Sequence, residues 1–210
     1  MMRHCPAAAI AAAFTISLLL PSLGFAASTS PGRERAETLV ATFKKVKKDD
    51  GKLTEADKAA NAKVFAELDT FLDFETLVSK PIAPRADKLK PEELAGFKAK
   101  FRELIRLVAY PNSGAFFREA TLSFQPEQAR GELLAVAMKV RLPAEDLDTV
   151  VEFLFAKVGG ALKVQDVLFE GDSLVKDYQN QITKVIDKSG IAGLMKILDD
   201  RLADLSKAKK

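Results

Sequence analysis

The 210-residue sequence contains no tryptophan, one histidine and one cysteine. His4 and Cys5 both precede an apolar stretch at the very start of the chain. If this leader is removed, the mature chain has neither residue type. A Ser-His-Asp triad, a thiolate nucleophile, a disulfide and a zinc site with His or Cys ligands are then excluded. The absence of disulfides is still compatible with an oxidising compartment, because a domain of this size can be stable without them.

The leader has the pattern of a secretory signal peptide. Arg3 precedes the apolar stretch AAAIAAAFTISLLL at positions 7 to 20. Pro21 then ends any helix. Gly24 and Ala26, in GFA at positions 24 to 26, are small residues of the kind that a signal peptidase recognises before its cleavage site. We therefore predict a cleaved signal peptide over residues 1–26. The alternative, an uncleaved anchor helix, is disfavoured because the stretch is shorter than the ~20 residues of a membrane span.

The rest of the chain is predicted to form one domain over residues 27–206, followed by a basic tail at 207–210. Without Arg3 it holds 31 Lys and Arg against 29 Asp and Glu, a net charge of +2. Domains that bind nucleic acid are normally strongly basic. Nucleic acid is therefore not an expected partner.

Periodicity predicts helices at both ends of this domain and strands between them. Apolar residues recur at helical spacing over 33–48, 54–72, 91–108, 173–188 and 191–205, and PNSG at 111–114 is expected to break the third helix. Period-2 alternation predicts strands at 121–125, 131–142, 148–158 and 161–170, with Gly159-Gly160 as a hairpin turn. Short connections favour antiparallel pairing. The predicted fold class is α+β, a four-stranded antiparallel curved sheet covered by helices.

The peptide EGDSL at 170–174 contains the GDSL sequence found around the nucleophilic serine of one type of lipase or esterase. A serine of that kind needs a histidine base, and no histidine follows Ser173. Lys176 is one helical turn away, but it would have to be desolvated to act as a base. We therefore expect Asp172 or Ser173 to cap the next helix, with Gly171 at the change of direction.

The same peptide belongs to a longer pattern, VQDVLFEGDSLVKDYQNQITKVIDKSGIAGLMKIL, at 164–198. It resembles the C-terminal signature of the MlaC, or toluene-tolerance, family, which runs V-x-D-V-x-x-E-G-x-S-L, then a Y-R/Q pair, then G-(I/L)-x-x-L. The matching residues are Val164, Asp166, Val167, Glu170, Gly171, Ser173, Leu174, Tyr178, Gly190, Ile191 and Leu194. LDTFLDFETLVSK at 68–80 and PEELAGFKAKFRELI at 91–105 are similar to two further family segments.

The resemblance covers roughly residues 35–205 and departs from the family at two places. Leu162 stands where the family usually has tryptophan, and AYPNSGAFF at 109–117 carries extra residues. The resemblance implies a nuclear-transport-factor-two-like sheet and helices around a deep apolar pocket. It also implies a periplasmic, monomeric, non-enzymatic shuttle that carries phospholipid between an outer-membrane lipoprotein complex and an inner-membrane ABC transporter complex. The bound phospholipid would be cargo, with no cofactor and no metal.

Phenylalanines suit such a pocket, because they bring apolar area without a polar group that needs a partner. Twelve of the fourteen remain once Phe14 and Phe25 leave with the leader. The residues predicted to line the lipid pocket are Leu104, Val108, Tyr110, Phe116, Phe117, Val136, Met138, Val151, Phe153, Phe155, Val167, Phe169, Val175, Tyr178 and Ile182. The alternative is that they form an ordinary hydrophobic core.

Two other functions stay open at this point. The same fold could carry a hopanoid or another polycyclic lipid. It could also support a small-molecule enzyme that uses carboxylates, or Tyr110 and Tyr178. A desolvated Glu152 or Asp166 deep in the cavity would distinguish this alternative. The lysines of KKVKK at 44–48, and Lys207, Lys209 and Lys210, are either solvated or contact anionic headgroups or an acidic partner.

The predicted cleavage site is directly testable. N-terminal sequencing of the exported protein should begin at Ala27, because Ala26 is the small residue expected before the cut. An exported chain that still begins at Met1 would contradict the signal peptide.

Overall fold

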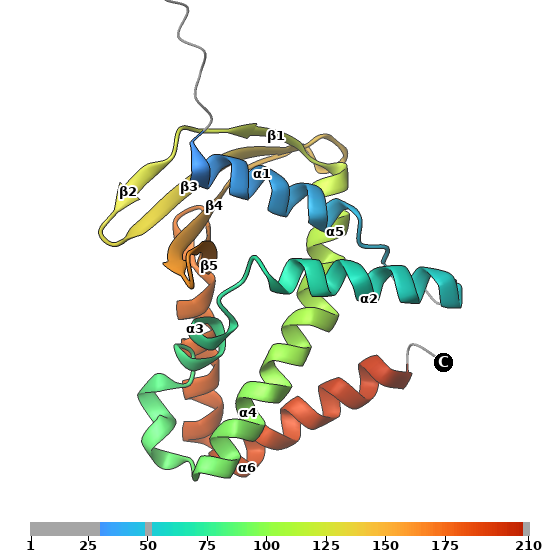
Figure 1. Ribbon diagram of the computed structural model, residues 1–210. Helices are drawn as coiled ribbons and strands as arrows, with labels where there is room; N and C mark the ends of the chain where they lie inside the picture. The colour runs from blue at the N-terminus through green and yellow to red at the C-terminus, as the bar shows by residue number, and fades with distance from the viewer. Residues whose placement is uncertain (1–29, 49–51, 208–210) are drawn as a thin grey trace, which may run out of the picture.

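The computed structural model describes residues 30–48 and 52–207, so the predicted signal peptide lies outside the described residues. Figure 1 shows an antiparallel sheet with helices against one of its faces and a helical layer that extends away from it. The predicted α+β class is confirmed. Within these two ranges, no helix combines the length and hydrophobicity that a membrane span requires.

The sheet contains the four predicted strands and two short ones. The strands are β1 (Thr121–Phe124), β2 (Gln128–Arg130), β3 (Leu133–Leu142), β4 (Leu147–Val158), β5 (Ala161–Phe169) and β6 (Asp172–Ser173). Their order is β1-β3-β4-β5-β6, and β2 pairs with β3 beyond the end of β1. Both β2 and β6 have too few residues to show an alternation in the sequence. Gly159 and Gly160 have φ of 58° and 83°, which makes the predicted two-residue hairpin between β4 and β5 possible.

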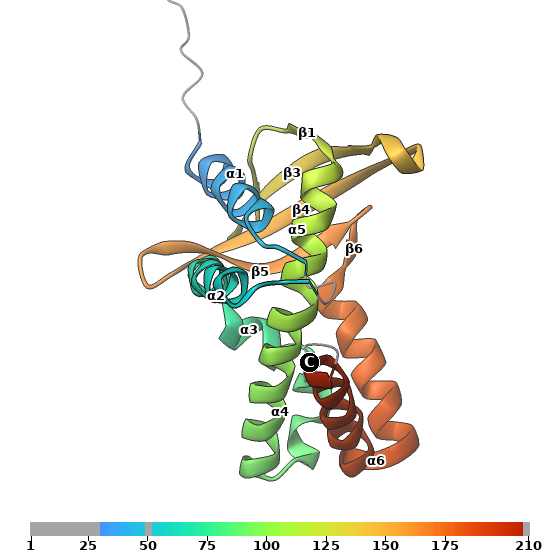
Figure 2. The same ribbon diagram turned by 90° about the vertical axis from the view of Figure 1, so that its right-hand side faces the viewer.

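The helices follow the predicted order. They are α1 (Pro31–Lys44), α2 (Glu55–Asp69), α3 (Phe74–Ser79), α4 (Pro91–Leu104), α5 (Tyr110–Glu119) and α6 (Leu174–Lys207), with 3-10 turns η1 (Ala83–Lys88) and η3 (Pro143–Glu145) and a π-helix η2 (Ile105–Ala109). Gly190, with φ of 68°, divides α6 into two arms, as the sequence predicts. Figure 2 shows the second arm folded back beside α4, and Lys100 of α4 pairs with Asp199 of that arm at 2.6 Å.

The expected break at PNSG is wrong, because the chain stays helical from α4 through η2 into α5. Proline lacks an N–H, and its ring obstructs the carbonyl four residues earlier in a regular α-helix. The wider π-turn directly before Tyr110 accommodates Pro111 without ending the helix. Gly114 serves close packing instead of a break, since a Cβ there would lie 2.7 Å from the carbonyl oxygen of Phe43 in α1. The result is one rod of about 40 Å along one side of the molecule.

The corner at EGDSL is a tight hairpin followed by a helix cap. Glu170 and Gly171 have φ of 50° and 88° and form the two-residue turn between β5 and β6. The hydroxyl of Ser173 accepts a hydrogen bond from the backbone N–H of Lys176 at 3.0 Å, so Ser173 caps α6. It also donates to Asp166 at 2.5 Å, and Asp166 accepts from the N–H of Val175 at 3.1 Å. The structural interpretation of Ser173 is confirmed.

The outer edge of β5 also holds the segment that leads into α3. Val164 donates its N–H to the carbonyl of Phe71 at 2.8 Å and accepts from the N–H of Asp73 at 2.9 Å. The carboxylate of Asp73 accepts from the hydroxyl of Thr76 at 2.6 Å and from the amide of Gln165 at 2.8 Å. Burial alone would raise the pKa of Asp73, but these hydrogen bonds outweigh burial and hold its pKa below the ordinary value.

This carboxylate predicts a pH dependence of stability. Because the folded-state pKa of Asp73 is lowered, its contribution is present above the unfolded pKa of about 3.9 and is lost as the pH falls through the folded value. The difference in unfolding free energy between wild type and Asp73→Ala should therefore shrink as the pH drops from 6 towards 3. Urea titrations at several pH values measure it. Ser123→Ala, which changes an exposed side chain that does not titrate, is the control and should alter the unfolding free energy equally at every pH.

A second prediction concerns Ser173. Ser173→Ala should lower the unfolding free energy by about 1 kcal/mol, the usual cost of an N-cap, and leave unchanged the lipid binding that the family resemblance implies. Ser123→Ala on β1, which is exposed, is the matched control for stability. Loss of lipid from a folded Ser173→Ala protein would contradict the structural role.

Candidate functional site

The candidate site is an apolar cavity of about 300 Å³ in the helical half of the molecule, against the sheet. Strands β4 and β5 form one wall, the rod of η2 and α5 forms another, and α3 and the start of α6 close the remaining sides. Nine of the fifteen residues predicted from the sequence line it: Tyr110, Phe116, Phe117, Val151, Phe153, Val167, Phe169, Val175 and Tyr178. Their role as lipid contacts stays a prediction.

The other six predicted residues lie outside the wall of this cavity. Val136, Met138 and Phe155 are fully buried in the main core on the same face of the sheet. Ile182 is buried in that core from α6, while Leu104 and Val108 are half-buried in α4 and η2. Period-2 alternation assigns a residue to a face of the sheet. It does not determine whether a helix packs over that residue or leaves a space.

The cavity also contains residues that sequence reasoning missed. They are Phe43, Leu72, Leu77, Ile105, Ala109, Asn112, Ser113, Val164 and Leu174. Asp166, which the sequence singles out as a possible cavity carboxylate, also lines it. Phe43 and Ile105 lie in the apolar stripes of their helices, so the periodicity contained a signal for them. Asn112 and Ser113 had none, because they lie in the stretch that was expected to be a break.

Aromatic side chains from three elements pack together at one end of the cavity. The ring centroid of Phe117 in α5 lies 5.8 Å from that of Phe43 in α1 and 6.4 Å from that of Phe153 in β4. Phe116 is edge-on to Phe117 at 5.1 Å. These contacts join the rod to both α1 and the sheet, so the position of the cavity wall is fixed from two sides.

Tyr110 is held as a neutral hydrogen-bond donor. Its hydroxyl donates to Asp69 at 2.8 Å, and Asp69 also pairs with Arg102 at 3.1 Å and Arg106 at 3.3 Å. Burial, followed by the negative charge of Asp69, raises the pKa of Tyr110 far above its ordinary value. Tyr110 is therefore committed to a structural ion-pair network and is poorly suited to proton transfer.

The two carboxylates considered for catalysis already have partners within the protein. Glu152 lies between the inward-facing Val151 and Phe153, on the opposite face of the sheet, and pairs with Arg130 at 2.6 Å. Asp166 lines the cavity, but its oxygens accept hydrogen bonds from Ser173, Val167 and Val175. Among residues 30–48 and 52–207, no cluster of three or more His, Cys, Asp or Glu could hold a metal ion.

Comparison with known proteins decides the family. The model of the family described as MlaC protein matches residues 36–200. The chain belongs to the MlaC family. A solved structure of a phospholipid-binding protein from Ralstonia solanacearum, in complex with a phospholipid, matches with a TM-score of 0.66 and 20% sequence identity. The match covers 84% of this chain and 99% of the other. No curated protein matches the chain significantly.

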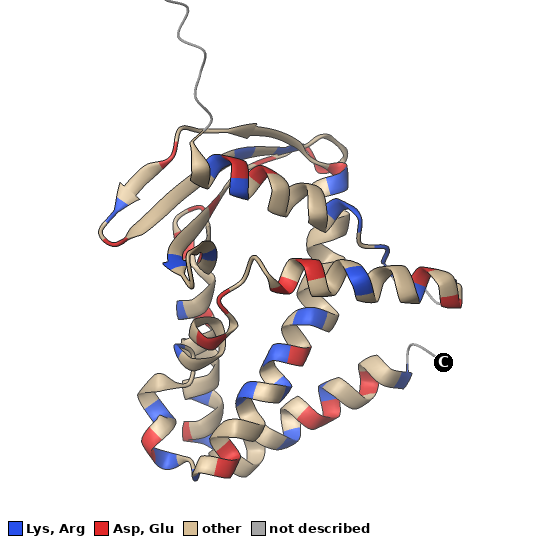
Figure 3. Cartoon of the chain, viewed as in Figure 1, with Lys and Arg blue, Asp and Glu red and all other residues tan. Residues whose placement is uncertain are grey.

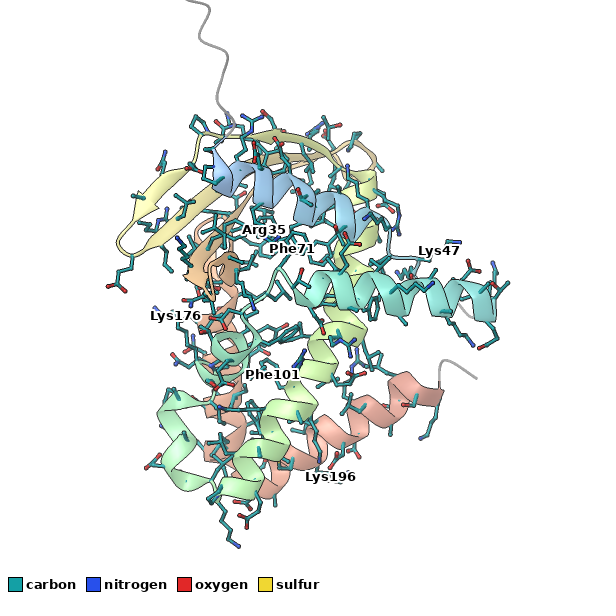
Figure 4. The ribbon with its side chains drawn as sticks, in the orientation of Figure 1. Arg35, Lys47, Phe71, Phe101, Lys176 and Lys196 are labelled. Atoms are coloured by element: carbon teal, nitrogen blue, oxygen red, sulfur yellow. The ribbon has the colours of Figure 1, made fainter. Side chains whose placement is uncertain are left out.

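Leu162 of this MlaC chain lies beside an arginine that connects three segments. Arg35 of α1 donates to the carbonyl of Leu162 at 3.0 Å and to that of Thr70 at 2.9 Å. Its guanidinium lies 3.8 Å from the ring centroid of Phe71, and both side chains are labelled in Figure 4. Arg35 thereby joins α1, the end of α2 and the start of β5 next to the cavity.

A second hollow of about 360 Å³ lies on the other side of η2. It is lined by Leu53, Lys58, Asn61, Ala62, Phe65, Arg106 and Leu107. Phe65 is edge-on to Tyr110 of the first cavity, with ring centroids 5.1 Å apart. The two hollows therefore lie back to back, and the first has the more apolar lining.

The basic segment at 44–48 is partly neutralised. Lys45 pairs with Glu67 at 3.1 Å, and Lys47 pairs with Asp57. Figure 3 shows that residues of both signs are interspersed along the helices. Lys207 lies 3.9 Å from Asp204, whereas Lys209 and Lys210 are outside the described residues. Contact of these lysines with headgroups or an acidic partner stays a prediction.

Proposed function

We propose that this protein is a non-enzymatic phospholipid carrier of the periplasm. The observation that carries the proposal is the apolar cavity between sheet and helices in a chain of the MlaC family. A carrier has to replace the bilayer around acyl chains, and each exposed methylene costs about 0.8 kcal/mol. Phenylalanine, leucine and valine side chains on both walls supply that environment.

An empty cavity would leave its apolar walls in contact with water, because the cavity opens to solvent on one side. Each Å² of apolar surface that is removed from water contributes about 25 cal/mol. An acyl chain that fills the space covers these walls, so we expect the protein to retain lipid when it is purified. The related fold of a protein that holds a phospholipid supports this proposal.

The route of transport follows from the predicted export. A monomer released into the periplasm by its signal peptide would receive phospholipid at one membrane complex and deliver it at another. The expected partners are an outer-membrane lipoprotein complex and an inner-membrane ABC transporter complex. Maintenance of lipid asymmetry between the membranes is the proposed outcome.

Filling the cavity should abolish lipid binding. Ala109 of η2 lines the cavity, and Ala109→Trp places a large ring into it, so the purified variant should carry at least tenfold less lipid than wild type. Solvent extraction and mass spectrometry quantify the lipid and distinguish phospholipid from a hopanoid. Ala203→Trp, at an exposed position in α6, is the matched control and should retain wild-type lipid. A wild-type protein with no lipid in its extract would contradict the proposed function.

A further inference from the structure

Two neighbouring polar side chains interrupt the apolar wall of the cavity. Asn112 and Ser113 are consecutive in α5, and both line the cavity. Asn112 is exposed and Ser113 is half-buried, so the pair lies where the cavity meets solvent. Within residues 30–48 and 52–207, neither side chain hydrogen-bonds to another protein group, so the amide and the hydroxyl can donate to a ligand in place of water.

The other polar groups of the wall do not compete for the same ligand atoms. Asp166 is already engaged by one hydroxyl and two backbone N–H groups. Tyr178 packs edge-on against Phe101 at 5.2 Å. Phe101 precedes Asn112 by eleven positions on the rod, about 16 Å at 1.5 Å per residue. Tyr178 therefore lies towards the far end of the cavity from the Asn112 and Ser113 pair.

The chemistry of the pair selects the kind of acceptor that it can bind. An amide and a hydroxyl are neutral donors, and no Lys or Arg is among the described residues that line the cavity. A phosphate would lack a counter-charge at this wall, and the only charged side chain among the described lining residues is the carboxylate of Asp166. Neutral carbonyl oxygens fit better. In a glycerolipid these are the ester carbonyls, which lie where the acyl chains leave the polar end of the molecule.

We propose that Asn112 and Ser113 donate hydrogen bonds to the ester carbonyl oxygens of a glycerolipid at the mouth of the cavity. The inference rests on the proposed lipid-carrier function and narrows its cargo to ester-linked diacyl lipids. Polycyclic hydrocarbons have no ester groups, and they would leave both donors without acceptors. Both donors lie in AYPNSGAFF at 109–117, the segment in which the resemblance to the MlaC family predicts extra residues.

A lipid pair that differs only in the ester linkage tests the inference. The protein is incubated with vesicles of equal parts diacyl and dialkyl ether phosphatidylcholine of matched chain length, repurified, and its bound lipids are quantified by mass spectrometry. The ether lipid lacks both carbonyls. Loss of one or two hydrogen bonds of about 1 kcal/mol each corresponds to a preference of roughly tenfold for the diacyl lipid in wild type.

The double variant Asn112→Leu with Ser113→Ala should bind the two lipids equally, because it keeps the shape of the wall and removes the donors. Asn180→Leu with Ser123→Ala, outside the cavity, is the matched control and should keep the wild-type preference. Equal binding by wild type, or a preference that persists in the double variant, would overturn the inference and leave the carrier function standing. No bound lipid of either kind in wild type would overturn both.

Discussion

The outer edge of strand β5 joins the sheet to the helices that enclose the cavity. An unpaired strand edge leaves N–H and C=O groups without partners. In this protein, two segments that are far apart in the sequence form hydrogen bonds with different parts of the β5 edge. The chain before α3 pairs at Val164, and β6 pairs at Leu168 and Phe169. Asp73 and Asp166 then fix the helices that start at these points, α3 and α6. Two walls of the cavity are consequently positioned from a single strand.

The opposite wall is positioned in a different way, by one long helical rod. Its surface ion pairs, Lys98 with Glu75, Lys100 with Asp199 and Arg102 with Asp69, connect it to α3, α6 and α2. Exposed pairs of this kind contribute little free energy each. The stabilisation comes instead from buried rings such as Phe97, Phe101, Tyr110 and Phe117 along the rod. Packing against neighbours on several sides allows the rod to stand next to a hollow without collapsing into it.

The sequence predicts the elements of this protein better than the boundary between its core and its cavity. Alternation located β3, β4 and β5, and helical spacing from position 54 located α2, because these patterns depend on local geometry. In the structure, Thr54 and Asp57 form a capping box at the start of α2. Val136 and Phe153 share one face of the sheet, yet only Phe153 reaches the cavity. That difference depends on where helices cross the sheet, which is a long-range property. Asn112 and Ser113 were missed because Pro111 and Gly114 look like helix breakers, although here a π-turn and a close approach to α1 accommodate them.

The π-turn η2 has a consequence for how the length of this rod can vary among related chains. In a regular α-helix each added residue rotates everything that follows by about 100°, so a one-residue insertion would turn the next face away from its partner. A π-turn takes up one additional residue within a single widened turn. Ile105–Ala109 holds such a residue in this chain, and the faces of α4 and α5 keep the orientation of a helix without it. Evolution can in this way alter the residues beside the cavity without rotating the aromatic side chains that pack at its end.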